Sequence, residues 1–365
     1  MHTVRAAVFE APGKPLTLQE ITPSDPGPGE VTIRMTAAGI CHSDASALTG
    51  AIPLPPGALH VLGHEGAGIV TAVGSGVRTV SEGDTVVVAG VASCGVCWHC
   101  LRGEGALCEE AATPSPHRAL TTAGDEVYGF GGVGVFAEAA TVSASSVTAL
   151  KTTLPASQLA LLGCALLTAL GAVTNSGQIQ VGDTVVVLGC GGVGQATVQI
   201  ARVAGAAFII AIDPVASKRE AALKAGATHA VDPGEDDPVE QVRALTGGRG
   251  ANVVIEVVGR AETQQQAWSM AARGGRVVAV GYPDPTSTIT LHGMEVVGSA
   301  RSLIGSFFGL TNPHADLPRL VALAEAGRID LGALVTRTIA LEDINGAFTE
   351  MEHGQVIRSV IDFAS

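Results

Sequence analysis

The chain contains 365 residues, which is enough for about two domains with separate hydrophobic cores. A formal net charge of −13 and a pI of about 5.2 argue against a partner with a phosphate backbone, so no nucleic acid is expected to bind. Hydrophobic residues make up 47%, yet the longest charge-free apolar stretch, residues 159–173, is shorter than the ~20 residues of a membrane-spanning helix. Because the N-terminal residues also lack an apolar leader, we expect no membrane partner and a cytoplasmic location.

Short β-type runs separated by Gly and Pro fill residues 1 to about 90, a spacing typical of a small barrel or sandwich. The runs are Arg5–Glu10, Leu16–Glu20, Glu30–Ala38, Ala67–Val73 and Asp84–Val88. Two polar clusters lie between them, Cys41-His42-Ser43-Asp44 and Gly63-His64-Glu65-Gly66. Both contain metal ligands, although each cluster taken alone is more typical of a polar turn.

Four cysteines follow at short spacings, Cys94-x2-Cys97-x2-Cys100-x7-Cys108. Four thiolates at this spacing can form a closed tetrahedral shell around Zn²⁺, which leaves no position open for a substrate. Two disulfides are disfavoured in a chain without a leader, and an iron–sulfur cluster is the less common alternative. The segment 94–108 is therefore predicted to be a structural zinc lobe.

A long loop is expected from Glu109 to about Gly134, before short strands resume and run to Leu150. Leu154–Gly177 is then predicted as one apolar helix that contains Cys164. A lone cysteine on such a face is usually a small buried hydrophobic residue.

The strongest motif begins at Asp183, where the strand Thr184–Leu188 is followed by a G-x-G-x-x-G loop, a helix, the strand Phe208–Ile212 and Asp213. This order is the dinucleotide-binding fingerprint, in which the loop and the first helical turn bind a pyrophosphate. The expected cofactor contacts are Gly189, Gly191, Gly192, Val193 and Gly194. Since a carboxylate at Asp213 accepts from a ribose hydroxyl and repels a 2′-phosphate, NAD is favoured over NADP.

Strands and helices then alternate, which predicts an α/β fold with a doubly wound parallel sheet. The expected helices are Ser217–Lys224, Pro238–Leu245 and Thr263–Ala272, and the strands are His229–Val231, Asn252–Val257 and Arg276–Gly281. Two further helices, Ala315–Ala326 and Glu342–His353, and a strand, Arg358–Phe363, complete the chain.

Taken together, these motifs resemble the zinc-dependent alcohol dehydrogenases of the medium-chain dehydrogenase/reductase family, over essentially the whole chain. The resemblance implies a GroES-like β-barrel catalytic domain, residues 1–165 and 308–365, around a Rossmann NAD-binding domain, residues 166–307. It also implies a small-molecule alcohol or aldehyde as the substrate.

Residue by residue, the resemblance implies two zinc ions per chain. Cys41, His64 and Cys164 match the family's catalytic zinc ligands, and Cys94, Cys97, Cys100 and Cys108 match its structural lobe. Asp44 matches the acid that orients the ligand histidine, and Glu65 matches a residue near the metal. Cys190, inside the glycine loop, has no metal role.

The family resemblance also implies how protons and the cofactor are handled. Ser43 matches the residue that passes the alcohol proton outward. Lys218 matches a ribose-contacting lysine, and His42 and Arg358 match positive groups near the pyrophosphate. This chain has Ser46 where some members carry the histidine that ends the proton relay, so the exit beyond Ser43 is left open.

Substrate size and assembly are implied in the same way. Gly90 matches a position that lines the alcohol pocket, and the missing side chain favours aryl or otherwise bulky primary alcohols. Alternatively, Gly90 only ends a strand, and Phe307 or Leu310 fills the space. The loop 109–134 resembles the insertion of dimeric members, whose Rossmann sheets join edge to edge, so a homodimer with Thr288–Ala300 at its interface is expected.

Two other functions remain open. A histidine after Cys41 also marks the family branch that oxidises thiol adducts of formaldehyde. A zinc-lobe protein that binds a partner is a non-enzymatic alternative, but a nucleic-acid partner would require a basic surface, which the net charge opposes. Zinc-free reductases of the superfamily would lack both cysteine sets.

Overall fold

The computed structural model describes residues 2–112 and 115–363. The chain forms two compact units, the first comprising Met1–Cys164, Asn312–Glu325 and Leu331–Ser365 and the second Ala165–Thr311 and Ala326–Asp330. The C-terminal segment expected in the first unit is therefore interrupted by residues 326–330. These residues belong to the second unit because Gln199 holds Asp330 there, through hydrogen bonds of 3.0 Å to its carbonyl and 2.6 Å from its amide.

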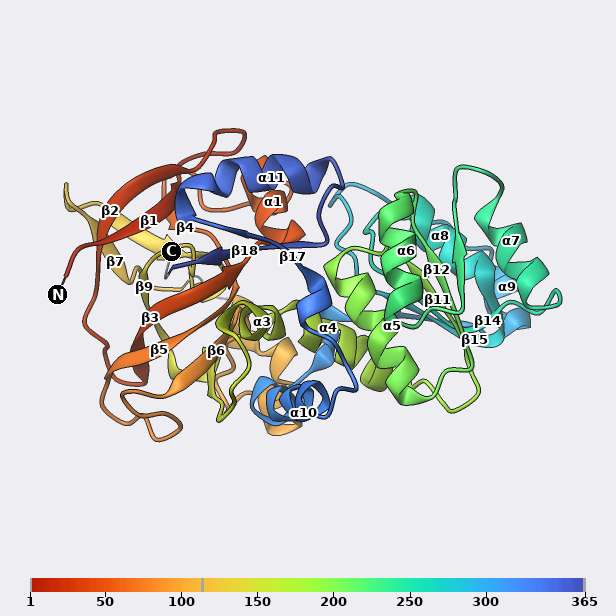
Figure 1. Ribbon diagram of the computed structural model, residues 1–365, viewed down its shortest axis with the longest axis horizontal. Coiled ribbons are helices and arrows are strands. Elements are labelled where there is room, and N and C mark those ends of the chain that lie inside the picture. Colours follow the sequence, from red (N-terminus) through yellow and green to blue (C-terminus); the bar gives the residue numbers. More distant parts are fainter. Residues whose placement is uncertain (1, 113–114, 364–365) are drawn as a thin grey trace. The chain divides into compact units, whose positions relative to one another are not determined.

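The first unit contains a closed barrel and an open sheet, as the short β-type runs predicted (Figure 1). The barrel has the order β1 (Val4–Phe9), β2 (Thr17–Pro23), β7 (Ala119–Thr121), β8 (Glu126–Gly129) and β4 (Leu59–Val61). The sheet has the order β10 (Val147–Ala149), β6 (Thr85–Ala89), β5 (Glu65–Val73), β3 (Glu30–Gly39), β18 (Arg358–Asp362) and β17 (Val335–Ile339), with β9 (Ala139–Ser143) also paired to β3.

Helices α1 (His42–Thr49), α3 (Ala156–Ala160), α10 (Pro313–Glu325) and α11 (Ile344–Glu352) complete the first unit, and α2 (Trp98–Leu101) lies in the cysteine-rich segment. The prediction of a loop over 109–134 is corrected by the structure, because this segment contributes β7 and β8 to the barrel. Both strands are too short for a clear alternating pattern, and they are joined by a turn in which the Thr121 hydroxyl accepts from the Asp125 amide.

The second unit is a six-stranded parallel sheet that confirms the predicted Rossmann architecture (Figure 1). Its order is β13 (His229–Val231), β12 (Phe208–Ile212), β11 (Thr184–Leu188), β14 (Ala251–Glu256), β15 (Ala271–Ala279) and β16 (Ser302–Gly305). The order reverses at β11, which is the switch point where dinucleotides bind in such sheets. The helices are α4 (Ala165–Gly171), α5 (Gly192–Ala204), α6 (Ala216–Ala225), α7 (Pro238–Leu245), α8 (Ala261–Met270) and α9 (Gly293–Ser299).

The single helix predicted over Leu154–Gly177 is also wrong, because the chain breaks at Cys164. This residue has φ −136° and ψ −66°, outside the helical region, and separates a 3₁₀ turn from α4. The apolar composition that suggested one helix reflects burial of both halves. No single helix in the described ranges is long and apolar enough to cross a membrane.

Candidate metal and cofactor sites

Cys41, His64 and Cys164 come together in the first unit from three distant parts of the chain. Cys41 is the N-cap residue of α1, His64 follows β4, and Cys164 occupies the break before α4. All three are buried, and their ligand atoms lie within 4.8 Å of one another. Two sulfurs and one imidazole form a donor set that suits Zn²⁺ and leaves a fourth position to water or substrate. The residues present therefore fit a catalytic zinc ion.

Asp44 holds two of these ligands in place. Its buried carboxylate accepts from the Cys41 amide at 3.1 Å and from the Gly63 amide at 3.0 Å, so it fixes the backbone beside both ligand segments. The same carboxylate lies 3.0 Å from His64 Nδ1. With Nδ1 as the donor, Nε2 keeps its lone pair for a metal. The orienting role implied for Asp44 therefore has a direct geometric basis.

Arg358 brings a positive charge to the same cluster. Its guanidinium is buried and donates to the Ile40 carbonyl at 2.8 Å and to Cys41 Sγ at 3.5 Å, while the Glu65 carboxylate lies 3.8 Å away. A hydrogen bond from Cys164 holds the pKa of Cys41 well below its ordinary value, with support from the Arg358 charge and against the effect of burial. A thiolate at Cys41 is thus favoured, as metal binding requires. A contact between Arg358 and the cofactor pyrophosphate stays a prediction.

Gly90 does not border open space, which removes the basis for a wide pocket at this position. A Cβ atom there would lie 2.8 Å from His64 Cβ and 3.2 Å from the His64 carbonyl oxygen. The place of the missing side chain is thus taken by the ligand histidine, and neither Phe307 nor Leu310 is needed to fill it. Gly90 lets the histidine pack closely against the end of β6.

Phe130 is a neighbour of the metal cluster that the sequence did not reveal. Its ring meets the His64 imidazole edge to face, with the ring centroids 5.6 Å apart. The residue lies in the glycine-rich segment predicted as a loop. An aromatic side chain among glycines was the one feature of the sequence that could have indicated a packing role for Phe130. Such packing restricts rotation of the imidazole.

The other polar residues of α1 lie at its first turns. Ser43 Oγ is 3.9 Å from Cys41 Sγ, so the expected proton carrier is adjacent to a ligand. Ser43 and Ser46 are half-buried, and His42 is exposed. The positions are compatible with transfer of a proton from the metal cluster through Ser43, whereas the exit beyond it and the cofactor contact of His42 stay predictions.

The four cysteines of the lobe converge as predicted from their spacing. All four sulfurs lie within 4.8 Å of one another, and two pairs, Cys94 with Cys100 and Cys97 with Cys108, are 4.0 Å apart. Tetrahedral Zn–S bonds of about 2.3 Å place sulfurs roughly 3.8 Å apart, so the lobe suits a closed zinc site. Hydrogen bonds from the Cys100 and Glu109 amides lower the pKa of Cys97 to about 6, which favours the thiolate.

Each glycine of the dinucleotide motif has a separate structural reason. Gly189 has φ +92°, a left-handed conformation that allows the tight turn after β11. A Cβ at Gly194 would lie 1.9 Å from the Gly189 carbonyl oxygen, so only glycine lets α5 pack against the turn. A Cβ at Gly191 would meet nothing within 4 Å, which leaves this backbone free for close approach by a phosphate. Gly192 and Val193 form the first turn of α5.

Asp213 lies at the end of β12, as predicted, and also organises the glycine loop. Its carboxylate accepts from the Cys190 amide at 2.7 Å and from the Val215 amide at 2.9 Å. Lys218 is half-buried in α6, where its carbonyl accepts from Gln195. The acid thus fixes the loop in addition to any contact with a ribose, a role that the motif alone did not indicate.

Two family models match this chain. Residues 27–152 match the alcohol dehydrogenase GroES-like domain, and residues 192–326 match the zinc-binding dehydrogenase domain. The matched ranges contain six of the seven predicted zinc ligands, all except Cys164, and all the glycine-loop positions from 192 onward.

Full-length relatives extend the match to the whole chain. A putative alcohol dehydrogenase D of Mycobacterium tuberculosis is 39% identical, with 99% of this chain and 100% of the relative covered. An S-(hydroxymethyl)glutathione dehydrogenase of Synechocystis is 38% identical, with 98% and 99% covered.

Solved structures are similar over the same length. A zinc-binding alcohol dehydrogenase domain protein of Burkholderia ambifaria has a TM-score of 0.94 at 32% identity, and benzyl alcohol dehydrogenase of Acinetobacter calcoaceticus has a TM-score of 0.92 at 29% identity. In both comparisons 99% of each chain is covered.

Proposed function

Because this chain belongs to the zinc-dependent alcohol dehydrogenases of the medium-chain dehydrogenase/reductase family, we propose that it reversibly oxidises a primary alcohol to the aldehyde with NAD. The observation that carries the proposal is the buried cluster of Cys41, His64 and Cys164, a three-ligand set beside a proton-carrying serine. The glycine loop at the switch point of the second unit supplies the cofactor site.

Two zinc ions per chain are proposed, one held by Cys41, His64 and Cys164 and the other by the four-cysteine lobe. The first, when bound, supplies a Lewis acid that lowers the pKa of an alcohol hydroxyl or polarises an aldehyde carbonyl. The second would stabilise the lobe directly, because its shell is closed.

The chain's own residues then bind, orient and move protons. Asp44 fixes the orientation of His64, and Ser43 Oγ takes the alcohol proton and passes it outward. The amides at the start of α5 would bind the pyrophosphate of the cofactor, whose nicotinamide supplies a hydride acceptor when bound. Arg358 offsets the negative charge that two thiolates and Glu65 bring to the buried cluster.

NAD rather than NADP is proposed on the charge around the expected ribose. The Asp213 carboxylate would repel a 2′-phosphate. Arg219, a neighbouring cation, forms an ion pair of 2.8 Å with Asp232 and donates to the Asp213 carbonyl, so its charge is already engaged. Both features favour a free 2′-hydroxyl.

An aryl or otherwise bulky alcohol is proposed as the substrate, supported by the likeness to benzyl alcohol dehydrogenase and no longer by Gly90. The thiol adduct of formaldehyde is the second candidate, supported by the relative that bears the name S-(hydroxymethyl)glutathione dehydrogenase and by His42 after the first ligand.

A steady-state assay separates the two substrates. The enzyme is supplied with NAD and either ethanol, benzyl alcohol or longer primary alcohols, or with formaldehyde in the presence and absence of glutathione, and NADH formation is followed. We expect benzyl alcohol to exceed ethanol in kcat/KM by roughly tenfold or more, since an apolar ring is buried. Thiol-dependent oxidation of formaldehyde as the dominant activity would replace the proposal, and Cys41→Ala serves as the inactive control.

A homodimer is proposed through the edge of the Rossmann sheet. Thr288–Ala300 does not form that edge, since this segment contains α9, and the last strand, β16, begins at Ser302. Met294 and Val297 on α9 are 91% and 83% exposed, which supports an apolar contact near β16, the last strand of the sheet among the described residues. Light scattering that gave a tetramer would contradict the dimer.

A further inference from the structure

A basic pocket lies at the end of the second unit opposite the cofactor loop. It is lined at the amino ends of β14 and β15, by Gly250 before the first strand and by Ala271 and Ala272 at the start of the second. The glycine loop follows the carboxyl end of β11. In a parallel sheet all carboxyl ends of the strands lie on one side and all amino ends lie on the opposite side. The pocket is therefore separate from the dinucleotide site.

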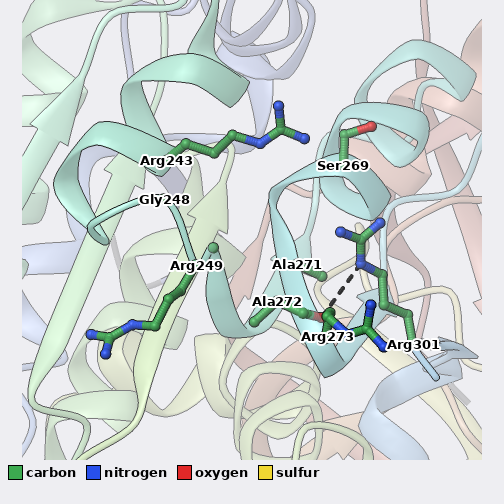
Figure 2. Close-up of a pocket in the computed structure, with 9 residues that line it drawn as sticks. Arg243, Gly248, Arg249, Ser269, Ala271, Ala272, Arg273 and Arg301 are labelled. Carbon is green, nitrogen blue, oxygen red and sulfur yellow. Dashed lines mark hydrogen bonds between the residues drawn. The ribbon is translucent and has the colours of Figure 1, made fainter. Parts of the chain in front are cut away.

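Four arginines line this pocket, although the whole chain has only 21 lysines and arginines together and a net charge of −13. Figure 2 shows Arg243 extending from α7 toward Ser269 of α8, with Arg273 and Arg301 across the pocket, and Arg249 turned outward. No acidic residue lines the pocket among the residues that the structure describes.

Arg301 is fixed in place before any ligand arrives. Its side chain is only 12% exposed, its Nε donates to the Ala272 carbonyl at 3.4 Å, and Nη1 pairs with Glu295 at 2.5 Å. The guanidinium also stands 5.7 Å from the centre of the buried Trp268 ring. A cation held by a carbonyl, a carboxylate and an aromatic face loses little entropy when it binds an anion.

The pocket has an excess of positive charge. Of its four guanidinium groups, Arg301 pairs with Glu295 and Arg243 pairs with Glu240 at 2.8 Å. Arg249 and Arg273 have no acidic partner within the described parts of the chain. Of the three arginines that face the pocket, Arg273 thus has a guanidinium that no described acidic residue neutralises, and the pocket has more positive than negative groups, which suits a phosphate monoester of charge roughly −1.5 to −2 at neutral pH.

We propose that this pocket binds a small phosphorylated ligand, through the guanidinium groups of Arg243, Arg273 and Arg301. Arginine suits phosphate because its planar fork donates two parallel hydrogen bonds. The cavity volume of about 520 Å³ accommodates a phosphate together with the small molecule that carries it. An extended polyanion fits less well, because the rest of this acidic chain would repel it.

The test is calorimetric titration of the full-length protein with inorganic pyrophosphate and, separately, with glycerol 3-phosphate. NADH is present in excess, so that the glycine loop is occupied and does not bind the probes. We expect one saturable site per chain. The double variant Arg243→Ala/Arg273→Ala, which changes only exposed side chains, should weaken binding by about tenfold or more, because two charge-assisted contacts are lost.

Arg78→Ala is the matched control, because it removes one exposed positive charge from the other unit and should leave the affinity unchanged. Absence of saturable binding, or equal weakening by Arg78→Ala, would overturn the proposal. Tighter binding of a duplex DNA oligonucleotide through the same arginines would also overturn it in favour of a nucleic-acid surface. The readout is affinity, so the outcome does not depend on the alcohol dehydrogenase activity.

Discussion

Asp44 makes the sharpest test of the metal cluster, because one carboxylate supports two ligands. In Asp44→Asn, the side-chain oxygen still accepts from Gly63 and His64, but the new amide group faces the Cys41 amide at the 3.1 Å contact. One buried N–H is then left without an acceptor, which costs about 1–3 kcal/mol of unfolding free energy. Loss of the charge also weakens the hold on the imidazole, and metal affinity should fall about 10–100-fold.

The assay combines zinc content with urea denaturation. After dialysis against a weak chelator, the Asp44→Asn variant should keep the lobe zinc and lose the cluster zinc. Its urea midpoint should be lower than that of the wild type. Asp84→Asn is the control, because Asp84 accepts from the Ser81 amide at 2.8 Å in an exposed turn of the same unit, where loss of the bond should cost little. If Asp44→Asn retained both zinc ions and the wild-type urea midpoint, the assignment of Asp44 as the support of both ligands would be refuted.

Further predictions follow from the glycines and the lobe. Gly90→Ala should displace the ligand histidine and reduce activity and zinc content, whereas Gly346→Ala, where a Cβ meets nothing within 4 Å, should be neutral or stabilising by about 0.5–1 kcal/mol. In thermal melts, Gly194→Ala should lower the melting temperature, because its Cβ would lie 1.9 Å from the Gly189 carbonyl oxygen. Gly191→Ala should keep the melting temperature and raise the KM for NAD. Equal effects of the two variants on stability would contradict the separate roles. Cys97→Ala should lose one zinc and unfold more easily, by urea denaturation, while the remaining folded protein keeps its cluster zinc.

The sequence alone predicted those features whose interacting residues are close to one another in the chain. The glycine loop and β11 were predictable because their residues are adjacent and each has a local steric reason. The lobe was predictable because its four cysteines lie within one short segment. By contrast, Cys41 and Cys164 are brought together by long-range packing, and only the family resemblance identified them as ligands of one metal.

The errors have the same physical origin. An apolar run cannot show whether its helix is continuous, so the break at Cys164 was missed. Gly90 was expected to open a pocket because it has no side chain. No sequence pattern reveals that His64 packs against this position. Phe130 was missed because its contact depends on how a glycine-rich segment folds over the cluster, which has no periodic signal.

The position of β18 in the first sheet has a consequence for synthesis of the protein. Arg358 begins this strand, which pairs with β3 through the register of Val360 with Gly39, and its guanidinium contacts Cys41. A chain emerging from the ribosome therefore presents the ligand thiols long before the cation that accompanies them. A chain truncated before Arg358 would therefore keep the pairing of β3 with β5 and β9, but it would lose β18 and the guanidinium that contacts Cys41.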